Sequence, residues 1–238
     1  ITIGIEEGLI VPKVPGQVRM ETPAGLVLVT YRQTGKKVDW VKLINVKSYL
    51  AATDLTIESS HLGELIFDVS YGGNFYAIID PQKNFSGIQD YSANELIQFS
   101  QELRAEINIK YSNLFIHPED TTIRNVSHML WTGNTMSNTA TARNAVFYGD
   151  KAIDRSPCGT GTSARMAQWY AKGKLTVAED FIHESYIGSQ FIGCVEEETE
   201  LAGKPAIIPS IKGWAKIYGH NTITIDDDDP YAHGFQVI

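Results

Sequence analysis

The sequence predicts an α+β protein in which strands outnumber helices. Three observations indicate this class. Short runs rich in β-branched and aromatic residues alternate with polar positions, turns containing Gly and Pro separate these runs, and two segments show helical spacing instead. A chain of 238 residues with 43% hydrophobic residues can bury one sizeable core or two small ones. We therefore expect a globular protein.

The first part of the chain predicts the end of a helix followed by an antiparallel sheet. Residues 1–9 are typical of a helix tail, because Glu6 and Glu7 precede Gly8, and glycine commonly follows a helix C-terminus. Strand-like runs, separated by Pro-Gly, Thr-Pro-Ala-Gly and Thr-Gly turns, follow at residues 17–20, 26–31 and 38–46.

A second set of strands begins near Glu64. Residues 65–71 alternate, run into Gly72-Gly73 and continue as a strand over residues 75–79. A glycine pair at such a place indicates a bulge or the close approach of another segment.

The clearest helix signal covers residues 92–111. Ser92 and Glu95 have the spacing of a capping box. Apolar residues then recur at helical spacing, namely Leu96, Phe99, Leu103 and Ile107. Further strands are predicted at residues 127–132, 145–148, 181–187, 191–197 and 205–208. The tail alternates again from Trp214 through Ile225, which predicts a final strand.

Cys158 occupies a turn between a predicted strand at residues 145–149 and a predicted helix at residues 163–171. Gly159 and Gly161 allow a ligand to approach the backbone closely, and the amides of a helix's first turn attract an anion such as a carboxylate. The same partial charge favours a thiolate. It predicts that the pKa of the Cys158 thiol falls roughly one unit below the ordinary value for cysteine.

The stretch from Asp154 to Ala164 resembles the second catalytic-cysteine motif of the proline racemase family, in particular its bacterial 4-hydroxyproline 2-epimerase branch. Other stretches resemble the same branch, so that the similarity covers essentially the whole chain. They are residues 71–77, 117–120, 127–133, 144–150 and 233–238. The resemblance implies a two-lobed proline racemase or diaminopimelate epimerase-like fold, in which each lobe is a β-sheet wrapped round a central helix. It places residues 64–213 in the second lobe and residues 1–63 and 214–238 in an incomplete first lobe.

The resemblance also implies a function, which is cofactor-independent inversion of the α-carbon of 4-hydroxyproline by two opposed thiols. Cys158 is then one catalytic acid or base. Asp154 holds the substrate ammonium, although an aspartate before a helix commonly caps a turn. Gly159 and Thr160 bind the substrate carboxylate.

Two further side chains are expected to contact the substrate ring. His128 is a candidate contact for the ring or its hydroxyl, although a lone histidine in a strand is as often a core residue. Phe75 is the second candidate. Cys194 lies in an alternating run and is interpreted as an ordinary strand residue.

A predicted helix ends at a glycine in each half of the chain, at Gly8 and at Gly173, and a strand-like run follows each glycine. If the halves are equivalent, the counterpart of Cys158 falls roughly two helical turns before Ile1. The family's first cysteine motif lies in that place. We therefore expect the chain as given to be catalytically incomplete, because one thiol serves only one face of the α-carbon.

Several alternatives remain open at this level. Proline racemase and hydroxyproline dehydratase activities belong to the same fold, and a binding module for a cyclic amino acid would keep the fold without the chemistry. Residues 159–164 also satisfy the G-x-G-x-x-A dinucleotide pattern, with Glu179 about twenty residues further on, which makes an NAD-dependent dehydrogenase a remote alternative.

Composition limits the partners. The net charge of -8 and the absence of a basic run longer than Lys36-Lys37 argue against nucleic acid and favour a small molecule. Two cysteines make no disulfide framework, and neither a signal-peptide pattern nor a membrane-length apolar run is present, so we expect a cytoplasmic protein without a membrane partner. No residue spacing indicates a metal or a cofactor. A homodimer is left open.

Overall fold

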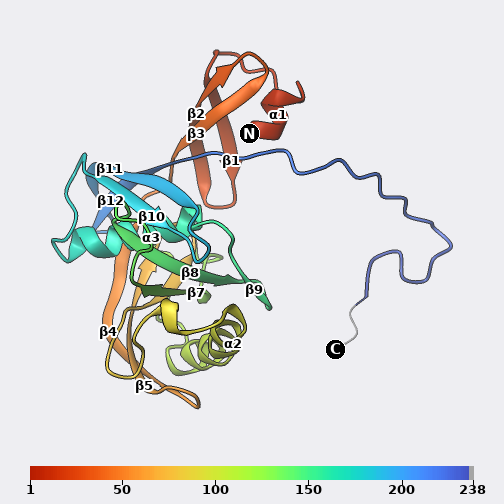
Figure 1. Cartoon of the computed structure of the whole chain (residues 1–238). Coiled ribbons are helices and arrows are strands. Elements are labelled where there is room, and N and C mark those ends of the chain that lie inside the picture. The colour runs from red at the N-terminus through yellow and green to blue at the C-terminus, as the bar shows by residue number, and fades with distance from the viewer. Residues whose placement is uncertain (236–238) are drawn as a thin grey trace.

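Strands make up most of the structure, a computed structural model that describes residues 1–235 (Figure 1). The helices are α1 (Thr2–Glu6), α2 (Ala93–Lys110) and α3 (Gly159–Ala171), with a 3-10 turn at Ile88–Asp90. The strands are β1 (Gln17–Thr22), β2 (Gly25–Thr34), β3 (Lys37–Ile44), β4 (Tyr49–Ser59), β5 (Gly63–Tyr71), β6 (Phe75–Ile79), β7 (Val126–Gly133), β8 (Ala142–Tyr148), β9 (Ala152–Ile153), β10 (Asp180–Glu184), β11 (Gln190–Leu201) and β12 (Lys204–Gly213). The α+β class is confirmed.

The strands form one mixed sheet with the order β1-β2-β3-β12-β11-β10-β8-β7-β6-β5-β4, and β9 pairs with β8. Neighbouring strands are antiparallel except for the pairs β8–β10 and β6–β7. The first three strands project from the rest of the molecule (Figure 1). The lobe boundary predicted at residue 64 falls at the start of β5, inside the β4–β5 hairpin, and that division stays a prediction.

Helix α2 forms as its capping box predicts. The Ser92 hydroxyl accepts the Glu95 amide, and the Glu95 carboxylate accepts the Ser92 amide. The four apolar residues predicted to line one face of this helix are all buried in the largest core cluster. The helix covers part of the sheet at β7 and β8. Both the predicted start of this helix and its predicted buried face are therefore confirmed.

Strand β6 separates two packing environments. Phe75, Ala77 and Ile79 belong to the core cluster that contains α2. Tyr76 and Ile78 belong to a different cluster, together with Leu130, Val146 and Ala164. Because side chains alternate between the faces of a strand, β6 is buried on both faces and reads as a continuous apolar run.

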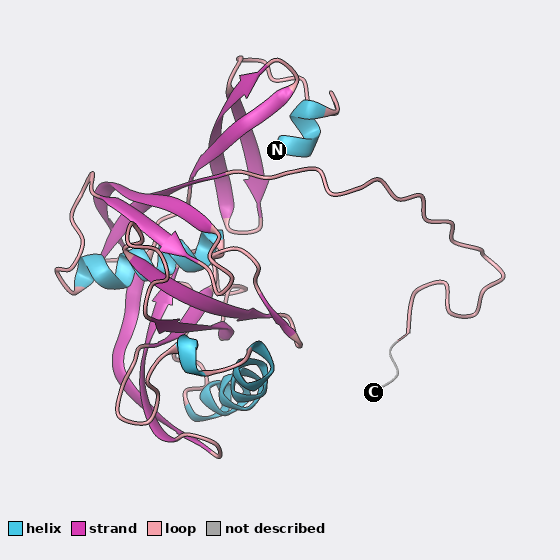
Figure 2. Ribbon diagram, in the orientation of Figure 1, coloured by secondary structure: helices cyan, strands magenta, loops and turns pink. Residues whose placement is uncertain are grey.

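Helix α3 lies among the strands (Figure 2), in contact with β4, β5, β6, β11 and β12. The predicted close approach at the glycine pair is confirmed. A Cβ atom on Gly72 would lie 2.2 Å from the Thr160 carbonyl oxygen and 2.5 Å from the Ala164 nitrogen, both in α3. Only glycine lets the backbone of α3 pack so closely against the end of β5.

Two predictions about strands are wrong. The sequence pattern missed β4, because Asp54 has a positive φ of 54° and two register shifts interrupt the alternation on which strand prediction depends. The predicted strand in the tail is absent from residues 214–235, which run away from the sheet without a neighbouring strand (Figure 1). Residues 236–238 lie outside the described part of the chain.

The predicted similarity between the ends of α1 and α3 is present in the backbone. Gly8 and Gly173 each follow their helix with a φ of +67°. Each donates its amide to the carbonyl three residues earlier, at 3.2 Å for Gly8 and 3.0 Å for Gly173. Both glycines therefore act as helix C-terminal residues in the left-handed region.

Candidate active site

The Cys158 turn connects β9 to α3, and Cys158 is the N-cap residue of the helix. Its φ of 65° and ψ of 124° lie in a region that favours glycine, so that the backbone is strained at this one residue. The neighbouring loop holds this conformation, since the Cys158 amide donates to the Ser156 hydroxyl at 3.1 Å. The Asn144 side-chain amide donates to the Pro157 carbonyl at 2.9 Å.

The Cys158 thiol is surrounded by hydrogen-bonding groups. The Gly161 amide lies 3.4 Å from Sγ, the Tyr76 hydroxyl 3.3 Å and the Thr160 hydroxyl 3.7 Å. Tyr76 and Thr160 also bond each other at 2.5 Å. A Cβ atom on Gly161 would lie 3.3 Å from Sγ and 3.3 Å from the Tyr76 ring, so a larger residue would fit only if these neighbours moved by a few tenths of an ångström.

The expected pKa of Cys158 is wrong in direction. Burial raises the pKa of the thiol above its ordinary value, although hydrogen bonds from Tyr76, Gly161 and Thr160 act in the opposite direction. The helix N-terminus favours the thiolate, whereas desolvation of the sulfur favours the neutral thiol. Desolvation is the larger effect here, because the thiol is enclosed between α3 and β6.

Asp154 caps the turn before α3, as an aspartate at such a position commonly does. One oxygen of its carboxylate accepts the Ser156 amide at 2.8 Å and the Ser156 hydroxyl at 3.0 Å. Asp154 is therefore a turn-capping residue in this structure. Its negative charge also acts on the pKa values of Cys158, Tyr76 and His128, which places it among the candidate site residues.

His128 lies in β7 beside the same cluster. Its ring stacks on the Tyr76 ring with centroids 4.8 Å apart, and its Nδ1 lies 2.7 Å from the Ser127 hydroxyl. Burial, and then the positive charge of Arg104, lower the pKa of His128 to about 4. The imidazole is consequently neutral near pH 7.

The amides at the start of α3 divide into two groups. Gly161 donates to the Cys158 sulfur, and Thr162 donates to the Cys158 carbonyl at 2.8 Å. Gly159 and Thr160 come before them, where a helix offers its amides no acceptor of its own. The space beside Gly159 is open, because a Cβ atom added there would meet nothing within 4 Å. A carboxylate fits the chemistry of these two amides.

Two residues differ from the predicted set. Tyr76 contacts the Cys158 thiol and was not predicted, whereas Phe75, which was, points into the other core and is only 1% exposed. The period-two alternation along β6 contained this information, but only the position of α3 reveals which face holds Cys158. Cys194 lies in β11, where its sulfur contacts the Val195 carbonyl at 3.7 Å.

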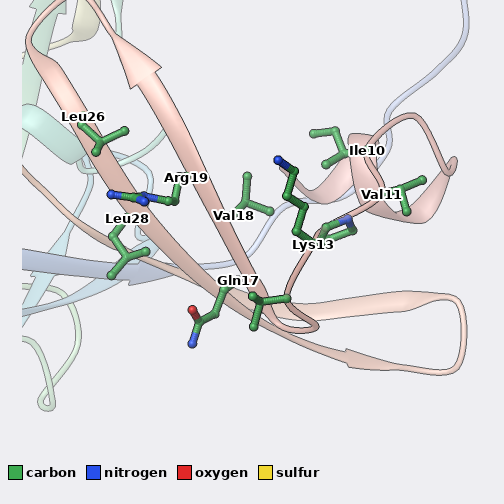
Figure 3. Close-up of a pocket in the computed structure, with 10 residues that line it drawn as sticks. Ile10, Val11, Lys13, Gln17, Val18, Arg19, Leu26 and Leu28 are labelled. Carbon is green, nitrogen blue, oxygen red and sulfur yellow. The ribbon is translucent and has the colours of Figure 1, made fainter.

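Two hollows are relevant to ligand binding. One of about 360 Å³ is bordered by Ser156 and Gly159 from the Cys158 turn and by apolar residues that include Phe191 and Trp214. A larger hollow of about 700 Å³ lies beside β1 and β2 (Figure 3), and its lining includes no residue of the Cys158 turn. Its lining is mainly aliphatic, with Lys13 and Arg19 as its charged residues. The smaller hollow is the better candidate for a ligand, because Ser156 and Gly159 of the Cys158 turn line it.

The dehydrogenase alternative is wrong. The dinucleotide fingerprint requires a parallel sheet whose first strand runs directly into the glycine turn. Here α3 follows β9, a two-residue strand that pairs antiparallel with β8. Glu179 lies before β10, and its carboxylate accepts the Thr176 amide and hydroxyl, both at 3.0 Å.

Residues 1–235 contain neither a cluster suited to a metal ion nor a membrane-spanning helix. No group of three or more His, Cys, Asp and Glu side chains in this part of the chain is arranged to hold a metal ion. No helix in the same residues is long and apolar enough to cross a membrane.

The mixed sheet around α3, with a cysteine at the N-terminus of that helix, defines an α+β protein with a thiol-centred site. This chain belongs to the proline racemase family, because the family model described as proline racemase matches residues 1–236. A Spirosoma linguale protein named 4-hydroxyproline 2-epimerase is 59% identical over 238 residues, which cover 100% of this chain and 71% of that protein. A Brucella ovis protein named 4-hydroxyproline epimerase is 57% identical over 237 residues, with the same coverage.

Solved structures agree with the family assignment. A hydroxyproline epimerase from Agrobacterium vitis with bound trans-4-hydroxy-L-proline superposes with a TM-score of 0.88 at 32% identity, over 99% of this chain and 67% of that one. A probable proline racemase from Agrobacterium radiobacter with bound carbonate gives a TM-score of 0.87 at 33% identity, over 99% and 68%. The predicted proline racemase fold is confirmed.

Proposed function

We propose that this chain carries the Cys158 side of a 4-hydroxyproline 2-epimerase active site, which inverts the α-carbon without a cofactor. The observation that carries the proposal is the position of Cys158, whose sulfur caps α3 next to two amides suited to a carboxylate. Relatives at 57–59% identity bear the epimerase name, which supports the choice of substrate.

The proposed chemistry is a proton transfer on each face of the α-carbon. The Cys158 thiolate removes the proton from one face in one direction, and the thiol returns a proton to that face in the other direction. The Gly159 and Thr160 amides hold the carboxylate. Asp154 attracts the ammonium, and His128 contacts the ring hydroxyl as a neutral hydrogen-bonding group.

Inversion requires a second acid-base group on the opposite face, because a single thiol mainly returns the proton to the face from which it came. The other cysteine of the chain, Cys194, is unsuited to this role, since it lies in β11 with its sulfur against its own strand. We therefore expect residues 1–238 alone to give no epimerisation.

The test has two arms, measured with trans-4-hydroxy-L-proline and with proline. The first uses the 238-residue chain, and the second uses the protein with any residues that its gene encodes ahead of Ile1. Polarimetry follows inversion, and NMR in heavy water follows exchange of the α-proton. We expect inversion of hydroxyproline in the second arm only, and its loss in the Cys158→Ser variant.

Cys194→Ala is the matched control and should retain the activity of the second arm. Several outcomes would contradict the proposal: a requirement for an added metal, pyridoxal phosphate or nucleotide, preference for proline, or release of water from hydroxyproline instead of inversion. Inversion by the 238-residue chain with Cys194→Ala would refute the two-thiol mechanism.

A further inference from the structure

We propose that Tyr76 is a positioning residue whose hydroxyl controls the ionisation of the Cys158 thiol through a hydrogen-bond chain that ends at Thr160. This inference rests on the proposed function in treating Cys158 as an acid and base. It adds a role for a residue of β6 whose hydroxyl contacts the Cys158 sulfur.

The Tyr76 hydroxyl is held in place. Its oxygen lies 3.3 Å from the Cys158 sulfur and 2.5 Å from the Thr160 hydroxyl oxygen. The side chain is 0% exposed, and its ring is fixed between the His128 ring and the apolar cluster of Ile78, Leu130, Val146 and Ala164. A buried hydroxyl must satisfy its hydrogen bonds with the partners around it, which here are these two groups.

The direction of the hydrogen bonds between Cys158, Tyr76 and Thr160 depends on whether the sulfur is a thiol or a thiolate. Tyr76 and Thr160 each have one hydroxyl proton to donate. When Cys158 is a thiol, its proton can point at Tyr76, and Tyr76 donates to Thr160. When Cys158 is a thiolate, it has become an acceptor only, so that Thr160 donates to Tyr76 and Tyr76 donates to the sulfur. The two hydroxyl groups therefore supply a donor to the thiolate by rotating their protons, without moving a heavy atom.

The electrostatics of the surroundings fit a donor role for Tyr76. Burial, and then the Cys158 charge, raise the pKa of Tyr76 well above 10, which favours the protonated phenol. The other titratable or charged groups that face this pair in the described chain are Asp154, His128 and, behind His128, Arg104. Asp154 opposes ionisation of the thiol, and His128 is neutral near pH 7. Tyr76 and the first-turn groups of α3 are thus the donors that favour the thiolate.

The experiment titrates the thiol directly. The 238-residue chain with Cys194→Ala has Cys158 as its single cysteine, and the rate of its alkylation by iodoacetamide is followed against pH. Tyr76→Phe removes the hydroxyl and keeps the ring. We expect its alkylation midpoint to move up by about one pH unit, which is about a tenfold lower rate at a fixed pH below the midpoint.

Tyr71→Phe is the matched control, because Tyr71 is another buried tyrosine of the same sheet that packs in the core away from Cys158. Its midpoint should equal that of the parent. Should Tyr76→Phe fail to fold by circular dichroism, 3-fluorotyrosine placed at position 76 keeps the shape and makes the hydroxyl a stronger donor. Its midpoint should move down.

An unchanged midpoint in Tyr76→Phe, or an equal shift in Tyr71→Phe, would overturn the role of Tyr76. An unchanged or raised midpoint with 3-fluorotyrosine would do the same. Because alkylation needs neither substrate nor turnover, these results stand apart from the epimerase assay. The epimerase assay can fail while the alkylation titration supports the role of Tyr76, and the titration can fail while the assay shows inversion.

Discussion

Single buried residues in this protein have consequences for its response to pH. His183 in β10 is 0% exposed, and its Nδ1 lies 2.9 Å from the Thr162 hydroxyl in α3. Its Nε2 is buried and has no hydrogen-bond partner within residues 1–235. Burial, and then the charge of Arg165, lower the pKa of His183 to about 3. The histidine is thus held neutral beneath the Cys158 turn.

This neutral histidine predicts a loss of stability in acid. Below its unfolded pKa of 6.5, the unfolded chain binds a proton at His183 that the folded chain refuses until the pH approaches 3. The free energy of unfolding should therefore fall between these values by up to roughly 1.4 kcal/mol per pH unit from this residue. Urea unfolding at a series of pH values checks this for the parent and for His183→Gln.

The difference between the two slopes isolates His183 from other titrating groups. The parent should lose stability more steeply than His183→Gln as the pH falls. Parallel slopes for the two proteins would mean that His183 is protonated as readily in the folded state as in the unfolded state.

At the scale of elements, the contact between β5 and α3 positions the thiol. Gly72 follows β5 and faces the backbone of the first turns of α3. The Asn45 side-chain amide contacts both segments, with the Gly72 carbonyl at 2.9 Å and the Ser163 hydroxyl at 2.8 Å. Helix α3 therefore begins at a place determined by a strand that lies far away in the sequence.

Gly72→Ala should separate these elements. The added methyl group would meet backbone atoms, which cannot rotate away as a side chain can, so α3 must shift. We expect a loss of roughly 1–3 kcal/mol in the free energy of unfolding, which chemical denaturation measures. Gly219→Ala is the control, since an added Cβ there meets nothing within 4 Å. Equal stability of the two variants would show that the contact is looser than described.

At the scale of the whole molecule, ion pairs that are buried on one side connect α3 to the central strands. The Arg165 guanidinium binds the Asp80 carboxylate with two hydrogen bonds, at 3.0 Å and 2.6 Å. Burial alone would raise the pKa of Asp80, but the Arg165 charge holds it below its ordinary value. Farther along the helix, Gln168 and Lys172 both bond to Asp68 in β5. One face of α3 is thus attached to β5 and to the end of β6.

Removal of one partner of the main pair should be costly. Arg165→Met removes two hydrogen bonds from the Asp80 carboxylate, but the Asp80 side chain is 42% exposed and water can take their place, so we expect a loss of roughly 1–2 kcal/mol in the free energy of unfolding. Asp80→Asn combined with Arg165→Met should cost less than the sum of the two single changes. A double-mutant cycle from denaturant unfolding measures this coupling.

Asp150→Asn is the control for this cycle. It breaks the pair between Arg104 and Asp150, whose carboxylate side chain is 87% exposed, so the change should stay within about 1 kcal/mol. Additive effects in the Arg165 and Asp80 cycle would mean that the two side chains contribute independently and do not anchor the helix together.

The sequence by itself determined the α+β class, the family, the capped helix α2 and the place of Cys158 at a helix start. Each of these depends on residues close together in the chain. A capping box spans four positions, strand alternation has a period of two, and the Cys158 motif is a continuous stretch. Interactions of this range can be read without coordinates. Strand β4 was not predicted, because its bulges interrupt the alternation of apolar and polar residues by which strands are recognised in a sequence.

Only the tertiary structure decided which side chains meet the thiol and how they affect it. Tyr76 and Phe75 are adjacent aromatic residues in the sequence, and which of them meets the thiol depends on which face of β6 α3 covers. The direction of the Cys158 pKa depends on desolvation by that same packing. Both outcomes arise from contacts between segments about 80 residues apart. Local patterns carry no information on such contacts, because desolvation and long-range packing exist only once the chain has folded.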